Sequence, residues 1–265
     1  MVNSQIVSAQ LSIVLVNYKT PDVTKICLEL LEQVIDVCKV PVIVVDNNSN
    51  DASLEYLKSL SWITLLERKV SKPDVGFMAH GLALDMAMEK VNTDYVLLIH
   101  TDTLIYDPEI INILLSSIGE KSAVAAVGCL EQVKRTAIQT AWRVFSRAIK
   151  FYMRKIKQML KLKTREPRLF YEVYLKSFCT LWNVNIIRQN RVNFAMGDRI
   201  PGYEMQDVLN RRGYEFIAIR PSKMFQYLDH IEAGTVALVE GLDKQHKRVK
   251  NAKKIIKINT VLKGY

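Results

Sequence analysis

Thr93-Asp94-Tyr95-Val96-Leu97-Leu98-Ile99-His100-Thr101-Asp102-Thr103 gives the strongest structural signal in this chain of 265 residues. Its apolar run from Tyr95 to Ile99 is typical of a strand that is buried on both faces of a parallel sheet. The run ends abruptly in polar residues, and open α/β sheets bind ligands just beyond the carboxyl ends of their strands. Asp102 is therefore placed where a carboxylate can hold a hard cation, the usual partner of a diphosphate. The alternative is that Asp102 and Thr103 only begin a turn.

Strands and helices alternate on both sides of this stretch, which predicts an α/β fold with a mostly parallel central sheet. Further strands are expected at residues 11–16, 41–45, 62–66 and 123–127. Helices are expected at residues 20–38, 52–60, 76–90 and 107–117. In the last third, we expect a strand or strand pair at 178–187, a helix at 202–212, and strands at 214–219 and 223–228.

The glycine-rich loops that bind phosphates through backbone amides are missing from the sequence. The first strand–helix junction contains no Gly-x-Gly-x-x-Gly, and no Gly-x-x-x-x-Gly-Lys-[Ser/Thr] occurs anywhere. Any nucleotide must therefore be held by side chains and a metal. Asn17 follows the first expected strand and Asp46 follows the second, so both are expected at the same sheet edge as His100. The alternative for Asp46 is that it only caps the following turn.

The composition limits the class of protein. Hydrophobic residues make up 49% of the chain, enough for a sizeable core. The four cysteines are scattered, which argues against a zinc site or a disulfide framework and fits a reducing compartment. The first residues do not resemble a signal peptide, and no apolar run approaches the roughly 18–20 residues that cross a bilayer. We therefore expect a cytoplasmic protein, free or peripheral at the inner face of the membrane.

The net charge of +10 is unevenly distributed. Residues 143–168 contain ten Lys or Arg against one acid, and residues 244–265 contain eight and no acid. Such segments predict an anionic partner, either a membrane surface or a nucleic acid. A nucleic-acid-binding protein would not need acidic clusters at strand ends, and the sequence has no aromatic stacking motif. We therefore expect a membrane surface and no nucleic acid.

Residues 142–163 predict a basic amphipathic helix. Apolar residues recur there at spacings of three and four: Trp142, Phe145, Ile149, Tyr152, Met153, Ile156, Met159 and Leu160. Most of the basic residues lie between them, a pattern typical of helices on anionic membranes. The alternative is that the apolar stripe packs on its own domain while the basic face is solvated. A second basic helix is expected beyond Val236.

Four blocks of residues, in order along residues 11–235, resemble an inverting family-2 glycosyltransferase of the GT-A fold, similar to a rhamnosyltransferase. The blocks are Ser12–Tyr18 with Val44–Ser49, then Gly76–Gly81, then His100–Thr103, and finally Glu204–Asp207 followed by His230. The third block stands in the place of the Asp-x-Asp motif. The fourth stands in the place of the acidic pair that supplies the catalytic base, with a late histidine that completes the metal site.

The resemblance implies one continuous domain, with a nucleotide-sugar-binding half at residues 1–130 and an acceptor-binding half at 131–265. It implies that the donor is contacted by Asn17, Asp46, His80 and His100. It implies a divalent metal, Mn²⁺ or Mg²⁺, at Asp102 and His230, and a catalytic base at Glu204 or Asp207. The donor would be a UDP-, GDP- or dTDP-linked sugar, and the acceptor a glycan or a lipid-linked molecule in polysaccharide or glycolipid assembly.

Two residues depart from the family pattern. Met205 replaces the aspartate of the usual Glu-Asp pair, and His100 replaces the first carboxylate of Asp-x-Asp. A non-catalytic scaffold of the same fold, docked on a membrane, is therefore one alternative function, and a basic nucleic-acid-binding protein is the other. The same residues also have structural interpretations: Glu204 and Asp207 can pair with neighbouring arginines, and His80 and His230 can be packing or turn residues.

Overall fold

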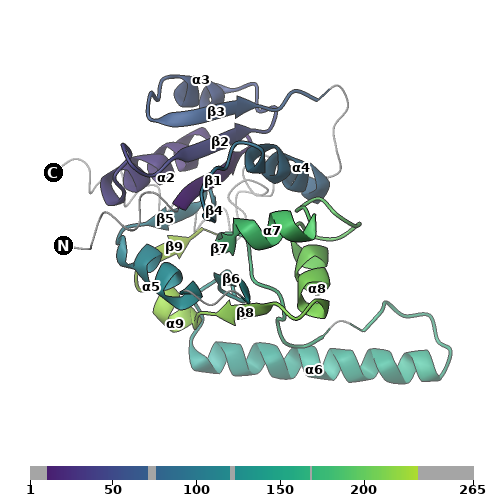
Figure 1. The fold of residues 1–265 in the computed structure, drawn as a ribbon. Coiled ribbons are helices and arrows are strands. Elements are labelled where there is room, and N and C mark those ends of the chain that lie inside the picture. Colours follow the sequence, from purple (N-terminus) through teal and green to yellow (C-terminus); the bar gives the residue numbers. More distant parts are fainter. Residues whose placement is uncertain (1–10, 71–75, 120–122, 168, 232–265) are drawn as a thin grey trace.

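Figure 1 shows the computed structural model of the chain, which describes residues 11–70, 76–119, 123–167 and 169–231. Within these ranges the main sheet contains seven strands: β1 (Leu11–Asn17), β2 (Val42–Asp46), β3 (Ile63–Glu67), β4 (Tyr95–His100), β6 (Val124–Gly128), β7 (Cys179–Asn183) and β8 (Glu215–Ala218). Their order in space is β3-β2-β1-β4-β7-β6-β8. Two short strands, β5 (Thr103–Ile105) and β9 (Leu228–His230), form a separate antiparallel ribbon.

Most neighbouring strands of the main sheet are parallel. Strands β3, β2, β1 and β4 run in one direction, and β6 is parallel to β8. Only β7 is antiparallel to its neighbours among the described strands of this sheet. The prediction of an α/β fold with a mostly parallel sheet is confirmed. The register pairs Asn17 with Asp46 and Val16 with His100, so the polar ends of these strands meet at one edge.

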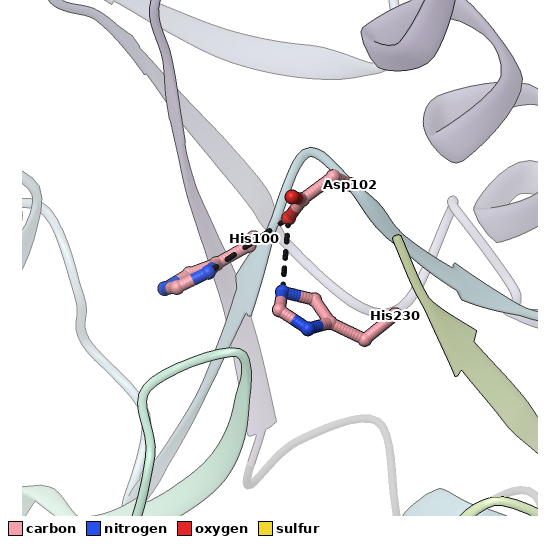
Figure 2. A group of neighbouring side chains, drawn as sticks. All are labelled: His100, Asp102 and His230. Carbon is pink, nitrogen blue, oxygen red and sulfur yellow. Dashed lines mark ion pairs between the residues drawn. The ribbon is translucent and has the colours of Figure 1, made fainter. Parts of the chain in front are cut away.

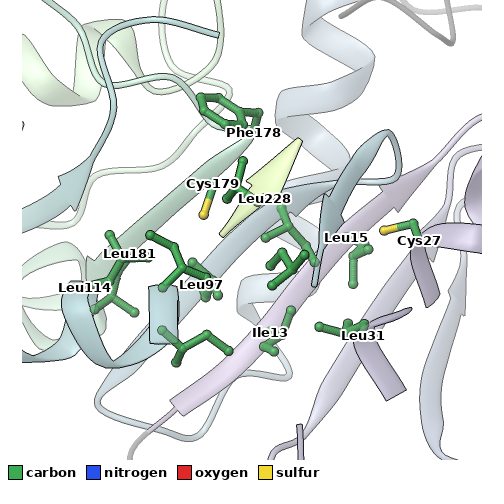
Figure 3. Close-up of a cluster of buried hydrophobic side chains, with 14 of the residues drawn as sticks. Ile13, Leu15, Cys27, Leu31, Leu97, Leu114, Phe178, Cys179, Leu181 and Leu228 are labelled. Atoms are coloured by element: carbon green, nitrogen blue, oxygen red, sulfur yellow. The ribbon is translucent and has the colours of Figure 1, made fainter. Parts of the chain in front are cut away.

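Helices cover both faces of the sheet (Figure 1). One core contains side chains of α2 (Pro21–Val34), α5 (Glu109–Ile118) and α9 (Pro221–Met224), and the other those of α4 (Gly76–Met88), α7 (Val184–Asn190) and α8 (Tyr203–Arg211). The helix α3 (Ala52–Lys58) packs against α2. Because strand side chains alternate, Ile13 and Leu15 enter the first core and Val14 and Val16 the second. Figure 3 shows part of the first core, with Leu31 of α2 beside the strands.

One predicted element is wrong, and another is correct only in its first half. Residues 223–228 were expected as a strand, but Pro221 begins the short helix α9 and the chain becomes extended only at Leu228. Pro fits the first helical position because its missing N–H is not needed there. Residues 178–187 were expected as a strand or strand pair, but β7 ends at Asn183, whose side chain accepts a hydrogen bond from the Ile186 amide and caps α7.

The predicted basic amphipathic helix is present as α6 (Ala137–Met159). It begins five residues earlier than expected because the side chain of Thr136 accepts from the Gln139 amide while the Gln139 side chain accepts from the Thr136 amide. Figure 1 shows α6 along the outside of the molecule, beyond β8. None of the described residues of α6 is fully buried. The second basic helix, expected beyond Val236, lies outside the described residues.

The apolar stripe of α6 does not pack on the described part of its own domain. Its eight residues between Trp142 and Leu160 are 45% to 82% exposed. By contrast, Arg143 and Arg147, on the opposite side of the helix by spacing, form ion pairs with the domain. The interpretation in which the stripe is covered while the basic face is solvated is therefore wrong for the described residues. None of the described helices is both long and apolar enough to cross a bilayer.

Candidate active site

Three polar side chains converge where β4 ends. His100 is the last residue of β4, and a turn through Asp102 leads into β5, where Thr103 pairs with His230 of β9. The Ile231 amide also donates to the Asp102 carbonyl at 3.0 Å. As a result, the Nε2 of His230 lies 3.1 Å and the Nδ1 of His100 lies 3.8 Å from Oδ1 of Asp102 (Figure 2). The sequence predicted Asp102 and His230 as partners, and the structure brings them together.

Backbone and side-chain contacts orient the two imidazoles. The Nδ1 of His230 lies 3.0 Å from the Gln132 carbonyl, which can only accept, so this nitrogen must donate. In a neutral ring, Nε2 then presents a lone pair toward the Asp102 carboxylate. Two facing acceptors repel each other unless a proton or a cation lies between them. The Nε2 of His100 lies 2.9 Å from Oγ of Ser177.

The donor set fits a divalent transition metal. The candidate ligand atoms of His100, Asp102 and His230 all lie within 4.8 Å of one another. One carboxylate oxygen and two imidazole nitrogens suit Mn²⁺ better than Mg²⁺, which prefers oxygen ligands in octahedral geometry. His100 had been assigned to the nucleotide from its position in the sequence, and the structure adds it to the candidate metal ligands.

His80 lies beside this cluster, in the first turns of α4. Its ring meets the ring of His100 edge to face, with centroids 5.4 Å apart. Its buried Nε2 has no hydrogen-bond partner among the described residues. Burial lowers the pKa of His80 to about 4. Burial is the largest cause that lowers the pKa of His100, and the neighbouring His80 is the second; together they lower it to about 3. Both rings are therefore neutral near pH 7.

Asn17 and Asp46 form a buried network at the adjacent strand ends. The side-chain nitrogen of Asn17 donates to Oδ1 of Asp46 at 2.7 Å and to Oγ of Ser53 at 2.8 Å. Its carbonyl oxygen accepts from Thr24, and Oδ2 of Asp46 accepts from the Ser49 amide at 3.0 Å. Asn17 therefore holds Asp46 in place. Each Asp46 oxygen has a second lone pair with which to accept from a ligand.

Glu204 and Asp207 lie three residues apart on α8 and share a partner, Arg199. Asp207 accepts from Arg199 at 2.5 Å and from the Tyr174 hydroxyl at 2.9 Å. Glu204 makes longer ion pairs, 3.2 Å to Arg199 and 3.6 Å to Arg211. The expected pairing with an arginine of the same helix is therefore present for Glu204. Met205, in the place of the family's aspartate, is fully buried in the core.

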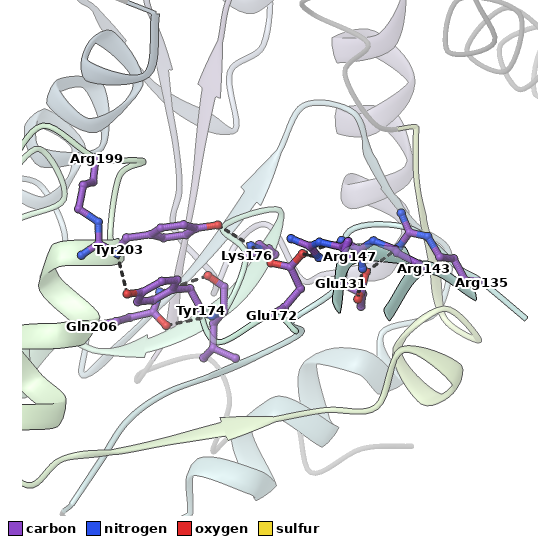
Figure 4. Close-up of polar contacts among 11 residues, drawn as sticks. Glu131, Arg135, Arg143, Arg147, Glu172, Tyr174, Lys176, Arg199, Tyr203 and Gln206 are labelled. Atoms are coloured by element: carbon purple, nitrogen blue, oxygen red, sulfur yellow. Dashed lines mark hydrogen bonds and ion pairs between the residues drawn. The ribbon is translucent and has the colours of Figure 1, made fainter. Parts of the chain in front are cut away.

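The sequence did not indicate a network of ion pairs that the structure contains. Figure 4 shows its members, which link the start of α6 to the segments before β7: Glu131, Arg135, Arg143, Arg147, Glu172 and Lys176. Lys176 also donates to the hydroxyl of Tyr203 in α8. The i,i+4 spacing of Arg143 and Arg147 indicated a shared face. Nothing local indicated that Glu172 would meet that face.

Several solved structures resemble this chain in fold. Mannosyltransferase PcManGT from Pyrobaculum calidifontis, solved with GDP-Man and Mn²⁺, matches with a TM-score of 0.55 and 14% identity, over 79% of this chain and 54% of that one. S. aureus TarS 1-349 matches with a TM-score of 0.53 and 15% identity, over 91% and 68% of the two chains. The chain thus spans about half the length of PcManGT.

A third structure matches at the same level. Glucosyl-3-phosphoglycerate synthase from Mycobacterium tuberculosis, solved with Mn²⁺, UDP and phosphoglyceric acid, gives a TM-score of 0.50 and 16% identity, over 79% of this chain and 67% of that one. At these identities the likeness establishes the GT-A fold alone. No curated protein matches the chain significantly.

The family follows from the sequence itself. Residues 12–180, more than half of the chain, match the model of the family described as Glycosyl transferase family 2. This range includes β1, β2 and β4, whose ends form the candidate site together with β9. The chain therefore belongs to glycosyl transferase family 2.

Proposed function

We propose that this protein transfers a sugar from a nucleotide-diphosphate donor to a hydroxyl of an acceptor, with inversion at the anomeric carbon. The observation that carries the proposal is the cluster of His100, Asp102 and His230 at the carboxyl end of β4. Neighbours of the same fold were solved with GDP-Man and Mn²⁺ and with UDP and Mn²⁺. Residues 1–130 would bind the donor and residues 131–265 the acceptor.

The nucleotide would lie along the ends of β1, β2 and β4. Asp46 has free accepting capacity for the N–H groups of a base, and Asn17 fixes its orientation. His80 and His100 would line the path from the base to the diphosphate. The base can be uridine, guanosine or thymidine, since an accepting carboxylate matches a ring N–H in each of them.

Asp102 and His230 would hold Mn²⁺, with His100 as a third ligand. When bound, the ion would neutralise the charge that develops on the leaving diphosphate. The Gln132 carbonyl and Ser177 orient the two imidazoles toward it.

Glu204 is our choice of catalytic base. Direct displacement needs a carboxylate that accepts the proton of the acceptor hydroxyl. Asp207 already accepts two short hydrogen bonds, whereas the ion pairs of Glu204 are longer and easier to replace. Asp207 would then position Arg199 and Tyr174.

The acceptor would be a glycan or a lipid-linked molecule reached at an anionic membrane surface. The exposed apolar stripe of α6 is flanked by Lys155 and Lys157. A helix with this pattern lies in the interface of an anionic membrane, its apolar side in the acyl region and its lysines near the headgroups. The protein would then be a peripheral enzyme.

A thermal-shift panel tests the proposed function. UDP, GDP and dTDP are added with and without Mn²⁺ to the wild type and to Asp102→Ala. We expect one nucleotide to raise the melting temperature only with Mn²⁺ and only in the wild type, because mass action stabilises the form that binds. An absence of any Mn²⁺-dependent shift would favour the non-catalytic scaffold.

A further inference from the structure

A cavity of about 360 Å³ lies beside the candidate metal ligands His100 and His230, and we call it the basic pocket. Two of its lining residues are the ones that orient the imidazoles. The Gln132 carbonyl holds His230, and the Ser177 hydroxyl contacts His100. A molecule in the basic pocket would therefore lie next to the place proposed for the donor's diphosphate.

The basic pocket has more positive than negative charge. Its described lining includes four cationic side chains and two carboxylates: Arg135, Arg143, Arg147, Lys176, Glu131 and Glu172. Glu172 alone pairs with three of the cations, at 2.6 Å to Arg143, 2.8 Å to Arg147 and 2.9 Å to Lys176. Glu131 pairs with Arg135 at 2.6 Å and with Arg143. The lining thus has an excess of two positive charges.

This excess is greater than attachment of α6 to the domain requires. One arginine on each carboxylate would tie the helix down, and additional partly desolvated cations raise the electrostatic cost of the fold. The side chains of Lys176 and Arg147 are only 13% and 32% exposed. A group of cations held close together in this way is stabilised when an anion enters.

The size of the excess indicates which anion fits. A phosphate monoester has a charge of about −1.5 to −2 at pH 7, which matches the net excess of two positive charges in the lining. Guanidinium groups bind its oxygens in bidentate fashion, and a lysine adds a point charge. The cavity also includes Tyr203 and Ile200, which can contact the organic part of a larger molecule.

The position of the basic pocket favours the acceptor over the donor. All of its described lining residues except Leu130 lie between residues 131 and 203, in the proposed acceptor half. The proposed nucleotide contacts Asn17 and Asp46 are not among them. Two lining residues, Arg143 and Arg147, come from the side of α6 opposite the exposed apolar stripe.

We propose that the basic pocket binds a phosphate group of the acceptor, through Arg143, Arg147 and Lys176. The assignment of this phosphate to the acceptor rests on the proposed function, whereas phosphate binding in the basic pocket does not. The phosphate can belong to a lipid anchor or to a soluble phosphorylated acceptor.

Calorimetric titration of the full chain in metal-free buffer tests the proposal. The probes are inorganic phosphate and monooctyl phosphate, titrated into the wild type, Arg147→Gln and Lys150→Gln. Lys150 is the matched control, because it is an exposed cation of the same helix that does not line the cavity. We expect Arg147→Gln to weaken phosphate binding by about tenfold or more and Lys150→Gln to leave it unchanged.

The two probes separate the sources of the phosphate. Tighter binding of the octyl ester supports a lipid-linked acceptor, and equal binding supports a soluble one. Equal phosphate affinity in the wild type and Arg147→Gln would overturn the proposal. If Arg147→Gln loses affinity, circular dichroism of this variant and recovery of binding in Arg147→Lys distinguish loss of the positive charge from misfolding.

A separate titration of nucleoside diphosphate with Mn²⁺ keeps the two proposals distinguishable. If Arg147→Gln weakens this binding as much as it weakens phosphate binding, the basic pocket belongs to the donor and the inference fails. If nucleotide binding does not depend on Asp102 while phosphate still binds through Arg147, the proposed function fails instead.

Discussion

His230 presents its Nε2 to Oδ1 of Asp102 at 3.1 Å, although β9 and the end of β4 are far apart in the sequence. The contact depends on the ribbon of β5 and β9, in which Thr103 pairs with His230. Without this ribbon, Asp102 would only lie in the turn that follows β4. The late histidine thus turns a strand end into a site that can hold a cation.

Removal of the Glu204 carboxylate should slow turnover strongly without abolishing donor binding. Glu204→Gln keeps the size of the side chain but cannot take a proton, so we expect kcat to fall by about 10²- to 10⁴-fold. Asp207→Asn should mainly lower the melting temperature, because it weakens contacts to Tyr174 and Arg199. Steady-state kinetics and melting curves of both variants provide the check. A larger loss of kcat in Asp207→Asn would reverse the assignment.

The exposed stripe of α6 should direct membrane binding. Replacing Ile149 and Ile156 with serine removes two apolar contacts with the acyl region, so flotation with phosphatidylglycerol-containing vesicles should decrease strongly. Leu82→Ser is the control, because Leu82 is an exposed apolar residue of α4, away from the stripe. Vesicles of phosphatidylcholine alone should bind weakly. Equal flotation of the two variants would contradict a role for the stripe.

Acid should loosen the attachment of α6. Burial alone would raise the pKa of Glu172, but its contacts with Arg147 and Lys176 outweigh burial and lower the pKa to about 2, from an ordinary value of 4.5. Its contribution to stability is therefore complete above pH 4.5 and is lost as the pH falls toward 2. Denaturant unfolding at several pH values measures this loss. Glu172→Gln should show a smaller decrease over that window, and identical pH profiles would refute the prediction.

Gly81 should be needed for the packing of α4. A Cβ at this position would lie 2.9 Å from the Cα of Ala195, a backbone atom that cannot turn away. We expect Gly81→Ala to reduce the free energy of unfolding by about 1–3 kcal/mol. Gly76→Ala in the same helix is the control, since nothing lies within 4 Å of its Cβ position. Denaturant titration should show no destabilisation of the control, and equal losses would argue against a steric cause.

The sheet and its functional edge could be predicted from the sequence, because buried strands appear as apolar runs and their ends as polar residues. Asn17, Asp46 and His100 were located in this way, and the sheet pairs Asn17 with Asp46 and Val16 with His100. The family resemblance added His230, which no local pattern relates to Asp102.

Other features depend on tertiary contacts that local patterns do not encode. Periodicity identified the apolar stripe of α6 but not the direction in which it faces. That direction is set by Glu131 and Glu172, which hold Arg143 on the domain side. The short helix α9 resembled a strand because its few apolar residues fit either period.

Electron paramagnetic resonance of Mn²⁺ tests the central claim most directly. Free Mn²⁺ gives a sharp signal that is lost when the ion binds to protein and nucleotide. The wild type with the nucleoside diphosphate selected by the thermal-shift panel should reduce this signal below that of Mn²⁺ and the nucleotide without protein, whereas Asp102→Ala and His230→Ala should weaken Mn²⁺ binding by at least about tenfold. Loss of the signal to the same extent in all three proteins would show that Asp102 and His230 do not bind the ion.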